Sequence, residues 1–249
     1  MVRVALVSYL NTTPFLYGLR ERGLMQSPHF QFEAFYPSAC AAALLEGRAD
    51  VGLVPVAVLP YLKGFRIVGE TCIGAVGEVR SVLLVSQKPL KEIKRIALDY
   101  QSRTSVQLCR LLCRDYWQIE PEFFPAQENY LDEVDGETAA VVIGDRAFDA
   151  LQSFRYTYDL SEQWQQHTGL PFVFAVWVAA DSVQDQDLKD FLSALSWGVE
   201  HAELAASEIH ERYPAHYDLK TYLSRNISYT LDADKRKGLE TFLQRISTL

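Results

Sequence analysis

The stretch that decides the fold is VALVSYLNTTPF at positions 4–15. Residues 4–7 form a continuous apolar run with β-branched members, which is typical of a short strand buried on both faces of a parallel sheet. Residues 8–13 then bring hydroxyl and amide groups, and Pro14 suits the first turn of a helix. In open α/β sheets ligands bind at such loops, because free backbone N–H groups and the helix dipole point into them. We therefore predict a ligand-binding loop directly after the first strand.

Outward from this loop, strands and helices continue to alternate. Residues 30–35 alternate apolar and polar side chains and predict a strand, and Ser38 suits the N-cap of a helix over 39–46 that Gly47 closes. Residues 49–55 predict a further strand. Such a series indicates parallel strands with right-handed crossovers.

A second series follows, with a loop of similar design. Residues 93–99 predict a strand that leads through the polar loop 99–105 into a helix, and short strands are expected at 123–125 and 139–145. The apolar run at 170–178 then returns the chain to its first part.

These patterns predict an α/β protein of two lobes, each a mostly parallel sheet flanked by helices. The long strands at 81–86 and 172–178 are the candidate hinges, because a cleft between two α/β lobes commonly closes over a small ligand. The predicted lobes are residues 1–86 with 175–249, and residues 87–174.

Composition and charge narrow the function classes. The chain has 249 residues, 49% of them hydrophobic, and its formal charge of −8 argues against nucleic acid or an anionic membrane as the main partner. No apolar leader precedes the first strand and no apolar stretch could span a bilayer, so we expect a cytoplasmic protein. The motifs of serine hydrolases, P-loop proteins and dinucleotide-binding proteins are absent. The histidines show no metal-binding spacing, and we expect the four cysteines to be reduced structural residues.

Two residues of the first loop are candidates for chemistry. The amide of Asn11 can donate and accept in one pocket, although a turn asparagine that bonds its own backbone is an equal alternative. Ser8 has the same two interpretations. Thr12 and Thr13 favour capping of the following helix over ligand contact.

The second loop offers a possible anion site. Ser102, Thr104 and Ser105 are expected at a helix N-terminus, where they either bind an anion or only cap the helix. Arg103 is either a partner for a carboxylate or a solvated arginine, with the second favoured.

The strand that ends near 143 brings a third set of candidates. Asp145 is a possible general acid or base, although a carboxylate capping the next helix is the favoured interpretation. Arg80 and Ser81 enter the strand at 81–86 and are expected to face the cleft.

Several of these segments occur together in one order. They are VSYLN at 7–11, GRADVGLVP at 47–55, RSVLLVS at 80–86, LD at 98–99 with SRTS at 102–105, and IGDRA at 143–147. In this combination the chain resembles the chorismate dehydratase family, which catalyses the first step of the futalosine route to menaquinone. The SYLN and SRTS elements are fairly specific, whereas DVGLVP is shared widely among proteins with periplasmic-binding-protein-like folds.

The resemblance implies a type 2 periplasmic-binding-protein fold with the substrate between two lobes. It implies that chorismate loses water to give 3-[(1-carboxyvinyl)oxy]benzoate, in a cytoplasmic enzyme that needs no cofactor or metal. We expect a monomer or homodimer with this small-molecule substrate and, from the net charge, no nucleic-acid or membrane partner. The departing hydroxyl is then expected near Ser8 and Asn11, and the general base is either Asp145 or the substrate's own enolpyruvyl carboxylate. The residues expected to bind the substrate are Ser81, Ser102, Thr104, Ser105, Pro55 and Gly144.

Two other functions remain open. One is a non-catalytic small-carboxylate binding protein of the same fold, and the other is the related 1,4-dihydroxy-6-naphthoate synthase of the same pathway. The SYLN loop favours the dehydratase over this synthase.

Overall fold

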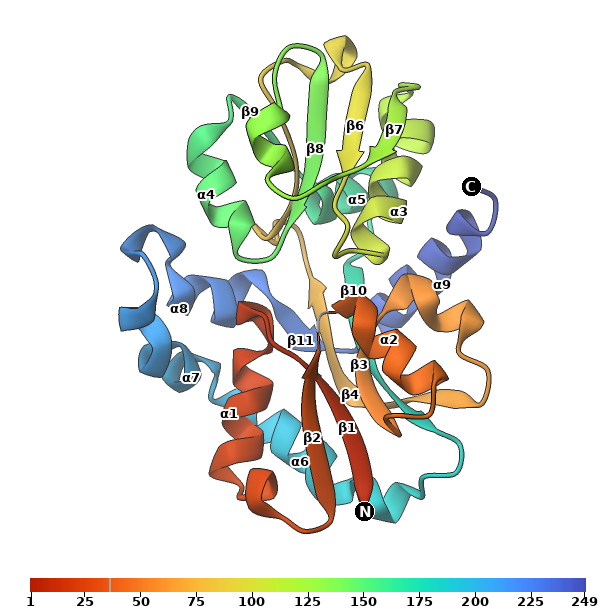
Figure 1. Ribbon diagram of the computed structural model, residues 1–249, viewed down its shortest axis with the longest axis vertical. Helices are drawn as coiled ribbons and strands as arrows, with labels where there is room; N and C mark the ends of the chain where they lie inside the picture. Colours follow the sequence, from red (N-terminus) through yellow and green to blue (C-terminus); the bar gives the residue numbers. More distant parts are fainter. Residues whose placement is uncertain (36) are drawn as a thin grey trace. The chain divides into compact units, whose positions relative to one another are not determined.

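The computed structural model describes residues 1–35 and 37–249, which form two α/β units, each with its own sheet (Figure 1). Unit 1 comprises Met1–Gly74 and Val173–Asp232, and unit 2 comprises Ala75–Phe172 and Ala233–Leu249. The predicted α/β class is therefore confirmed.

Unit 1 is built on a six-stranded sheet with the order β11-β4-β10-β3-β1-β2. Its strands are β1 (Val2–Val7), β2 (Phe30–Phe35), β3 (Val51–Pro55), β4 (Phe65–Ala75), β10 (Phe172–Ala180) and β11 (Ser228–Thr230). Its helices are α1 (Thr13–Glu21), α2 (Pro37–Leu45), α6 (Asp185–Glu200), α7 (Ala202–Ile209) and α8 (Leu219–Thr221). As expected from its apolar run, β1 is buried, with Val4 and Ala5 1% and 0% exposed, but it lies between β3 and the edge strand β2 and not at the centre of the sheet.

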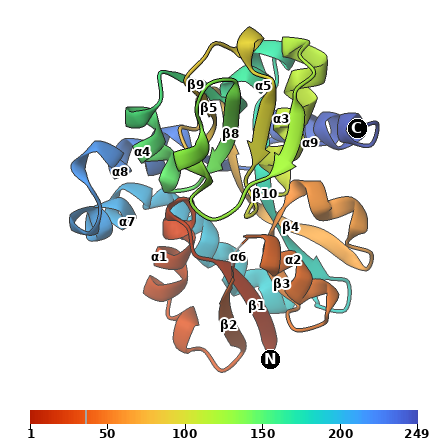
Figure 2. The same ribbon diagram turned by 45° about the horizontal axis from the view of Figure 1, so that its top comes forward.

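Unit 2 is built on a five-stranded sheet with the order β7-β6-β8-β5-β9 (Figure 2). Its strands are β5 (Val82–Ser86), β6 (Arg95–Leu98), β7 (Glu122–Pro125), β8 (Thr138–Ile143) and β9 (Tyr156–Asp159). Its helices are α3 (Thr104–Leu112), α4 (Arg146–Ser153), α5 (Leu160–Thr168) and α9 (Ala233–Ile246).

Both sheets are mixed, which corrects the expectation that they are mostly parallel. Strand β1 runs parallel to β2 and β3, but β10 pairs with β3 in the antiparallel direction. In unit 2, β6 is parallel to β7 and β8, whereas β5 is antiparallel to β8 and β9. An apolar run indicates burial on both faces but carries no information about strand direction.

The division of the chain also differs from the predicted lobes. Strand β5 pairs with β8 and β9, so residues 75–86 belong to unit 2, and the chain first changes unit near the end of β4. Helix α9 belongs to unit 2 as well, because Phe242 lies 5.0 Å from Phe172 and 6.1 Å from Trp164 between ring centroids. The second change of unit, at the start of β10, lies where a hinge strand was expected.

Two helix starts differ from the expected caps. Helix α2 begins at Pro37, which places Ser38 inside the helix instead of at its N-cap. Thr12 occupies the N-cap of α1, yet its side chain makes no capping hydrogen bond. Among the described residues, no helix combines the length and apolar character needed to cross a membrane.

Candidate functional site

The structure brings three of the predicted residues to one edge of the unit 1 sheet. Ser8 and Asn11 follow the carboxyl end of β1, and Pro55 is the last residue of the parallel neighbour β3. Ser8 is exposed, Asn11 is half-buried and Pro55 is buried. Carboxyl ends of parallel strands are the usual ligand-binding edge of an α/β sheet.

The backbone around Asn11 is held rigidly. The hydroxyl of Thr12, 2% exposed, lies 2.7 Å from the Val7 carbonyl and 2.8 Å from the Tyr9 carbonyl, so it ties the loop to β1 instead of capping α1. The Tyr229 hydroxyl donates to the Asn11 carbonyl at 2.9 Å, and burial keeps the pKa of Tyr229 well above its ordinary value.

The side-chain amide of Asn11 is not used in this scaffold. It makes no hydrogen bond with any residue of 1–35 and 37–249, so it is not the self-bonding turn asparagine of the alternative interpretation. A fixed backbone with a free amide is the arrangement that a preorganised binding group requires.

The other six predicted residues lie together at one edge of the unit 2 sheet. Strands β6 and β8 end there, and the antiparallel β5 begins there. The Gly144 N–H donates to the Ser81 carbonyl at 2.9 Å, which joins two of the segments. Gly144 has φ of +68°, a conformation in which a side chain would be strained, so the turn before Asp145 requires glycine.

The loop before α3 provides both a cap and buried hydroxyls. The Ser102 hydroxyl accepts from the Ser105 N–H at 3.0 Å, so Ser102 does serve as a helix cap. Thr104 and Ser105 are 3% and 4% exposed. Arg103 is exposed and makes no ion pair with the described residues, as a solvated arginine would.

Asp145 is at the N-cap position of α4, but its carboxylate makes no capping hydrogen bond. The capping interpretation is therefore wrong for this residue. Its half-buried position beside Gly144 leaves a role in proton transfer open.

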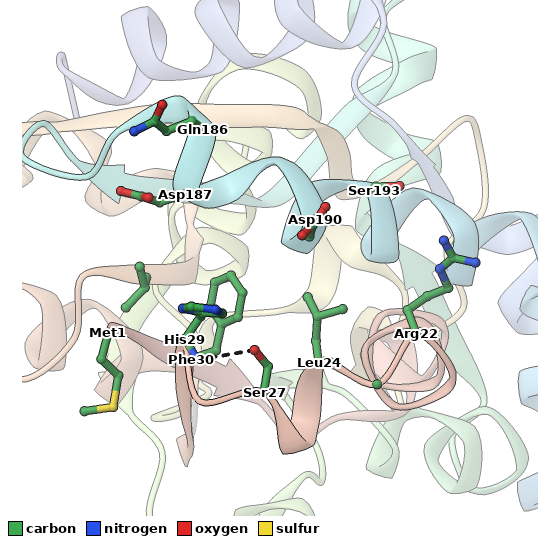
Figure 3. Close-up of a pocket in the computed structure, with 12 residues that line it drawn as sticks. Met1, Arg22, Leu24, Ser27, His29, Phe30, Gln186, Asp187, Asp190 and Ser193 are labelled. Atoms are coloured by element: carbon green, nitrogen blue, oxygen red, sulfur yellow. Dashed lines mark hydrogen bonds between the residues drawn. The ribbon is translucent and has the colours of Figure 1, made fainter.

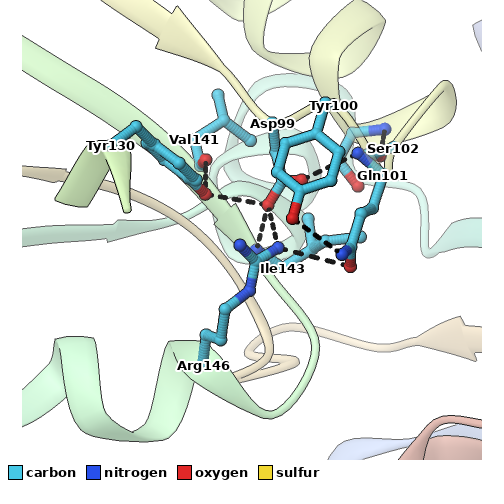
Figure 4. A network of polar contacts seen from close by, with 9 residues as sticks. Asp99, Tyr100, Gln101, Ser102, Tyr130, Val141, Ile143 and Arg146 are labelled. Carbon is cyan, nitrogen blue, oxygen red and sulfur yellow. Dashed lines mark hydrogen bonds and ion pairs between the residues drawn. The ribbon is translucent and has the colours of Figure 1, made fainter. Parts of the chain in front are cut away.

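Figure 4 shows a polar network centred on Asp99, which is 1% exposed and was not among the site residues predicted from the sequence. The Tyr130 hydroxyl and the Arg146 Nη2 lie 2.8 Å and 2.7 Å from its Oδ2, and the Gln101 N–H donates to its Oδ1 at 2.9 Å. Burial raises the pKa of Tyr130, with the Asp99 charge adding to the effect. The position of Asp99 directly after a buried strand could have indicated such a network, because a buried carboxylate needs a cation or several hydrogen-bond donors.

A second buried carboxylate holds the segment before Ser81. One Asp159 oxygen accepts from the backbone N–H groups of Val79 and Arg80 at 2.9 Å and 2.6 Å. The other accepts from the N–H groups of Ser161 and Glu162 in the first turn of α5. Arg80 is thereby kept at φ of +65°, an uncommon conformation for a residue with a side chain. Asp159 thus fixes the entry of β5, where Ser81 lies.

A cavity of about 540 Å³ lies elsewhere in unit 1 (Figure 3). It contains Met1 and Val2, at the start of β1, so it is at the sheet edge opposite Ser8 and Asn11. Asp187 and Asp190 of α6 contribute to it across from His29. None of the predicted site residues lines it, and within residues 1–35 and 37–249 no cluster of three or more His, Cys, Asp or Glu residues forms a metal site.

A family model and a curated protein each match nearly the full length of this chain. The family model described as menaquinone biosynthesis matches residues 2–248. The chorismate dehydratase of Thermus thermophilus is 28% identical over 268 aligned positions, which cover 98% of this chain and 94% of that protein.

Solved structures share the fold at low sequence identity. A protein of Archaeoglobus fulgidus superposes with a TM-score of 0.77 at 15% identity, covering 99% of this chain and 97% of that one. A Candida albicans protein described as having the generic periplasmic binding protein fold gives a TM-score of 0.67 at 13% identity, with 100% and 90% coverage. The predicted periplasmic-binding-protein fold is therefore confirmed.

Proposed function

The chain belongs to the menaquinone biosynthesis family, and on this premise we propose that it is a chorismate dehydratase that converts chorismate to 3-[(1-carboxyvinyl)oxy]benzoate and water. The observation that carries the proposal is the similarity to the Thermus thermophilus chorismate dehydratase, because it extends over 98% of the chain and so includes the polar edges of both units.

The reaction needs orientation more than a strong nucleophile. The ring C–H bond next to the departing hydroxyl breaks, its electron pair forms the new ring double bond, and the C–O bond breaks to release hydroxide that leaves as water. Because the ring becomes aromatic, the substrate supplies much of the driving force. The protein has to hold the ring, take one proton and stabilise the leaving oxygen.

The unit 1 loop is suited to the leaving oxygen. We assign the free amide of Asn11 to donate to it, with the exposed hydroxyl of Ser8 beside it. The fixed Asn11 backbone supports this role, since a donor that is already oriented needs little reorganisation in the transition state.

The unit 2 edge is suited to a carboxylate. We assign Ser81, Thr104 and Ser105 to it, together with the N–H groups at the start of the nine-residue helix α3. Helix N-termini bind anions through free N–H groups and the helix dipole, so a net charge of −8 is compatible with a dianionic substrate.

The proton acceptor is either Asp145 or the enolpyruvyl carboxylate of chorismate itself. Asp145→Asn separates these two mechanisms, because it removes the protein base and leaves the substrate base intact. Nearly full turnover supports the substrate-assisted mechanism, and loss of turnover with intact chorismate binding supports Asp145.

The decisive experiment incubates the purified protein with chorismate, follows the diene absorbance and determines the product mass. A product lighter by one water supports the proposal. Saturable binding without turnover supports a carboxylate-binding protein instead, and absence of both directs attention to the related 1,4-dihydroxy-6-naphthoate synthase. The proposal extends to a cytoplasmic monomer or homodimer with a small-molecule substrate and no nucleic-acid or membrane partner.

A further inference from the structure

Arg146 is a cation at the unit 2 edge whose donors are only partly used. It is the first residue of α4, and its side chain reaches across to Asp99 at the end of β6 (Figure 4). Its Nη2 is bonded, to Asp99 at 2.7 Å and to the Gln101 side-chain oxygen at 3.4 Å. Its Nε and Nη1 have no hydrogen-bond partner among residues 1–35 and 37–249, and its side chain is 36% exposed.

The guanidinium is nevertheless held in place. The Asp99 side chain is fully buried, and the rings of Tyr100 and Tyr130 lie 5.8 Å and 5.7 Å from the guanidinium carbon. The position of the group is thus fixed on one side, while the donors on its other side remain available.

Arg3 shows what a structural arginine looks like in this chain. Its side chain is 41% exposed, close to the value for Arg146, and it also pairs with an aspartate, Asp50. All three of its nitrogens are bonded, however, since Nε and Nη2 bind Asp50 and Nη1 donates to the Gly47 carbonyl at 2.6 Å. An arginine that serves only to neutralise a buried aspartate would be expected to use the same two-nitrogen geometry.

We propose that Arg146 binds one carboxylate of the substrate through its unused Nη1, and that Asp99 is the residue that positions it. The inference rests on the proposed function and adds to it the charged group that the dianionic substrate otherwise lacks. Arginine is suited to this role because its planar guanidinium carries several N–H donors that point in different directions, so one nitrogen can bind Asp99 while another binds a second anion. Asp99 keeps the guanidinium oriented and leaves Nη1 free.

The test compares Arg146→Lys with Arg3→Lys by chorismate KM and kcat, product Kd and thermal unfolding. A lysine at position 146 can still neutralise Asp99, but it has no second nitrogen that could bind the substrate carboxylate. We expect KM and Kd to rise by about 10- to 100-fold, the range of a lost charge-assisted hydrogen bond, with kcat within about threefold. Arg3→Lys is expected to lower the unfolding temperature and leave both KM and Kd unchanged.

A second variant distinguishes weaker substrate binding from loss of folding. Arg146→Gln with Asp99→Asn removes both charges of the pair, so no buried carboxylate is left unpaired, and the same weakening of substrate binding is expected. Added guanidinium ion should restore part of the affinity of this double variant.

The possible failures are distinguishable. If the wild-type protein turns over chorismate but Arg146→Lys has wild-type KM and Kd, the role of Arg146 is refuted and the proposed function stands. If Arg3→Lys weakens binding equally, the effect belongs to folding and the inference is again refuted. If the wild-type protein binds chorismate without turnover, the dehydratase proposal fails and the Kd ratio still decides the role of Arg146. If the wild-type protein neither binds nor turns over chorismate, the dehydratase proposal and the role of Arg146 are both refuted.

Discussion

Asn11 combines an immobile backbone with a free functional group. Its carbonyl accepts from Tyr229, and the neighbouring Thr12 hydroxyl ties the loop to β1, while its own amide has no partner among the residues that the structure describes. Removal of the amide should therefore affect catalysis without affecting folding.

We expect Asn11→Ala to lower kcat for chorismate by about 100-fold, the typical effect of losing one preorganised donor. The unfolding temperature should change by less than about 2 °C, because no internal hydrogen bond of the side chain is lost. Steady-state kinetics and a thermal melt measure both. Tyr229→Phe serves as the control that does lower the melting temperature. Wild-type kcat in Asn11→Ala would remove this residue from the mechanism.

The cysteines give a second prediction at this scale. All four, Cys40, Cys72, Cys109 and Cys113, are buried free thiols, and burial raises the pKa of Cys40 to about 12. Only the thiolate reacts readily with disulfide reagents. In the native protein at mildly alkaline pH, we expect no fast reaction with dithionitrobenzoate, and four reactive thiols after denaturation in urea. A rapid native thiol would contradict this expectation.

At the scale of elements, two helices of unit 1 meet through glycines. A Cβ added to Gly18 of α1 would overlap the Ala194 carbonyl oxygen, and one added to Gly198 of α6 would overlap the Pro14 carbonyl oxygen. Figures 1 and 2 both show α1 and α6 side by side. This close approach fixes the start of α1, and therefore the loop that carries Asn11.

Gly18→Ala should destabilise the protein by about 3 kcal/mol, because the helices must move apart. In an ordinary helix the same change stabilises by about 0.5–1 kcal/mol, so the sign of the effect is diagnostic. Urea denaturation measures the free energy of unfolding. A neutral or stabilising result would show that the two helices tolerate a methyl group at their contact.

The link between β5 and α5 predicts a pH dependence. Burial raises the pKa of Asp159 to about 7 from its ordinary value of 3.8, against the opposing effect of the backbone N–H groups that it binds. Between these two values the folded protein keeps a proton that the unfolded chain has released, so this residue makes the free energy of unfolding fall as pH rises.

We expect the difference in unfolding free energy between wild type and Asp159→Asn to fall from the ordinary pKa of 3.8 to about 7 and then level off. Asp50→Asn is the matched control, because Arg3 lowers the pKa of Asp50 and the stability it contributes is instead lost as pH falls. Urea titrations across this range measure both. Parallel curves for wild type and Asp159→Asn would contradict the prediction.

At the scale of the molecule, each unit is assembled from two separate stretches of chain. Unit 2 is completed by α9, whose Phe242 packs edge to face against Trp164 and Phe172. Unit 1 has a comparable anchor in Phe191 of α6, whose ring lies 5.8 Å from that of Phe30 in the other stretch. Phe242 and Phe191 are both fully buried.

Phe242→Ala should cost about 3–5 kcal/mol, since it leaves a cavity in unit 2. We expect faster amide hydrogen exchange in residues 75–172 and little change in residues 1–74. Phe191→Ala should produce the reverse distribution. Hydrogen exchange with mass spectrometry measures the amide exchange rates in both variants. Equally faster exchange in both units would show that the two units unfold together.

The α/β class, the positions of most strands and the two polar loops could be predicted from the amino-acid sequence, because these depend on local periodicity and on residues that suit turns. Strand 30–35 and the loops around Asn11 and Ser102 follow directly from such patterns. The SYLN and SRTS segments also sufficed to indicate the family.

How these strands, helices and loops come together became clear only from the folded structure. Strand direction and the assignment of β5 and α9 to unit 2 depend on partners far along the chain, which local periodicity does not specify. The same holds for Asp99 and Arg146, 47 positions apart, where a buried carboxylate selects one nitrogen of the arginine and leaves the others available. Burial and long-range pairing are properties of the folded chain, and they separate residues that hold the site from those that are free to bind.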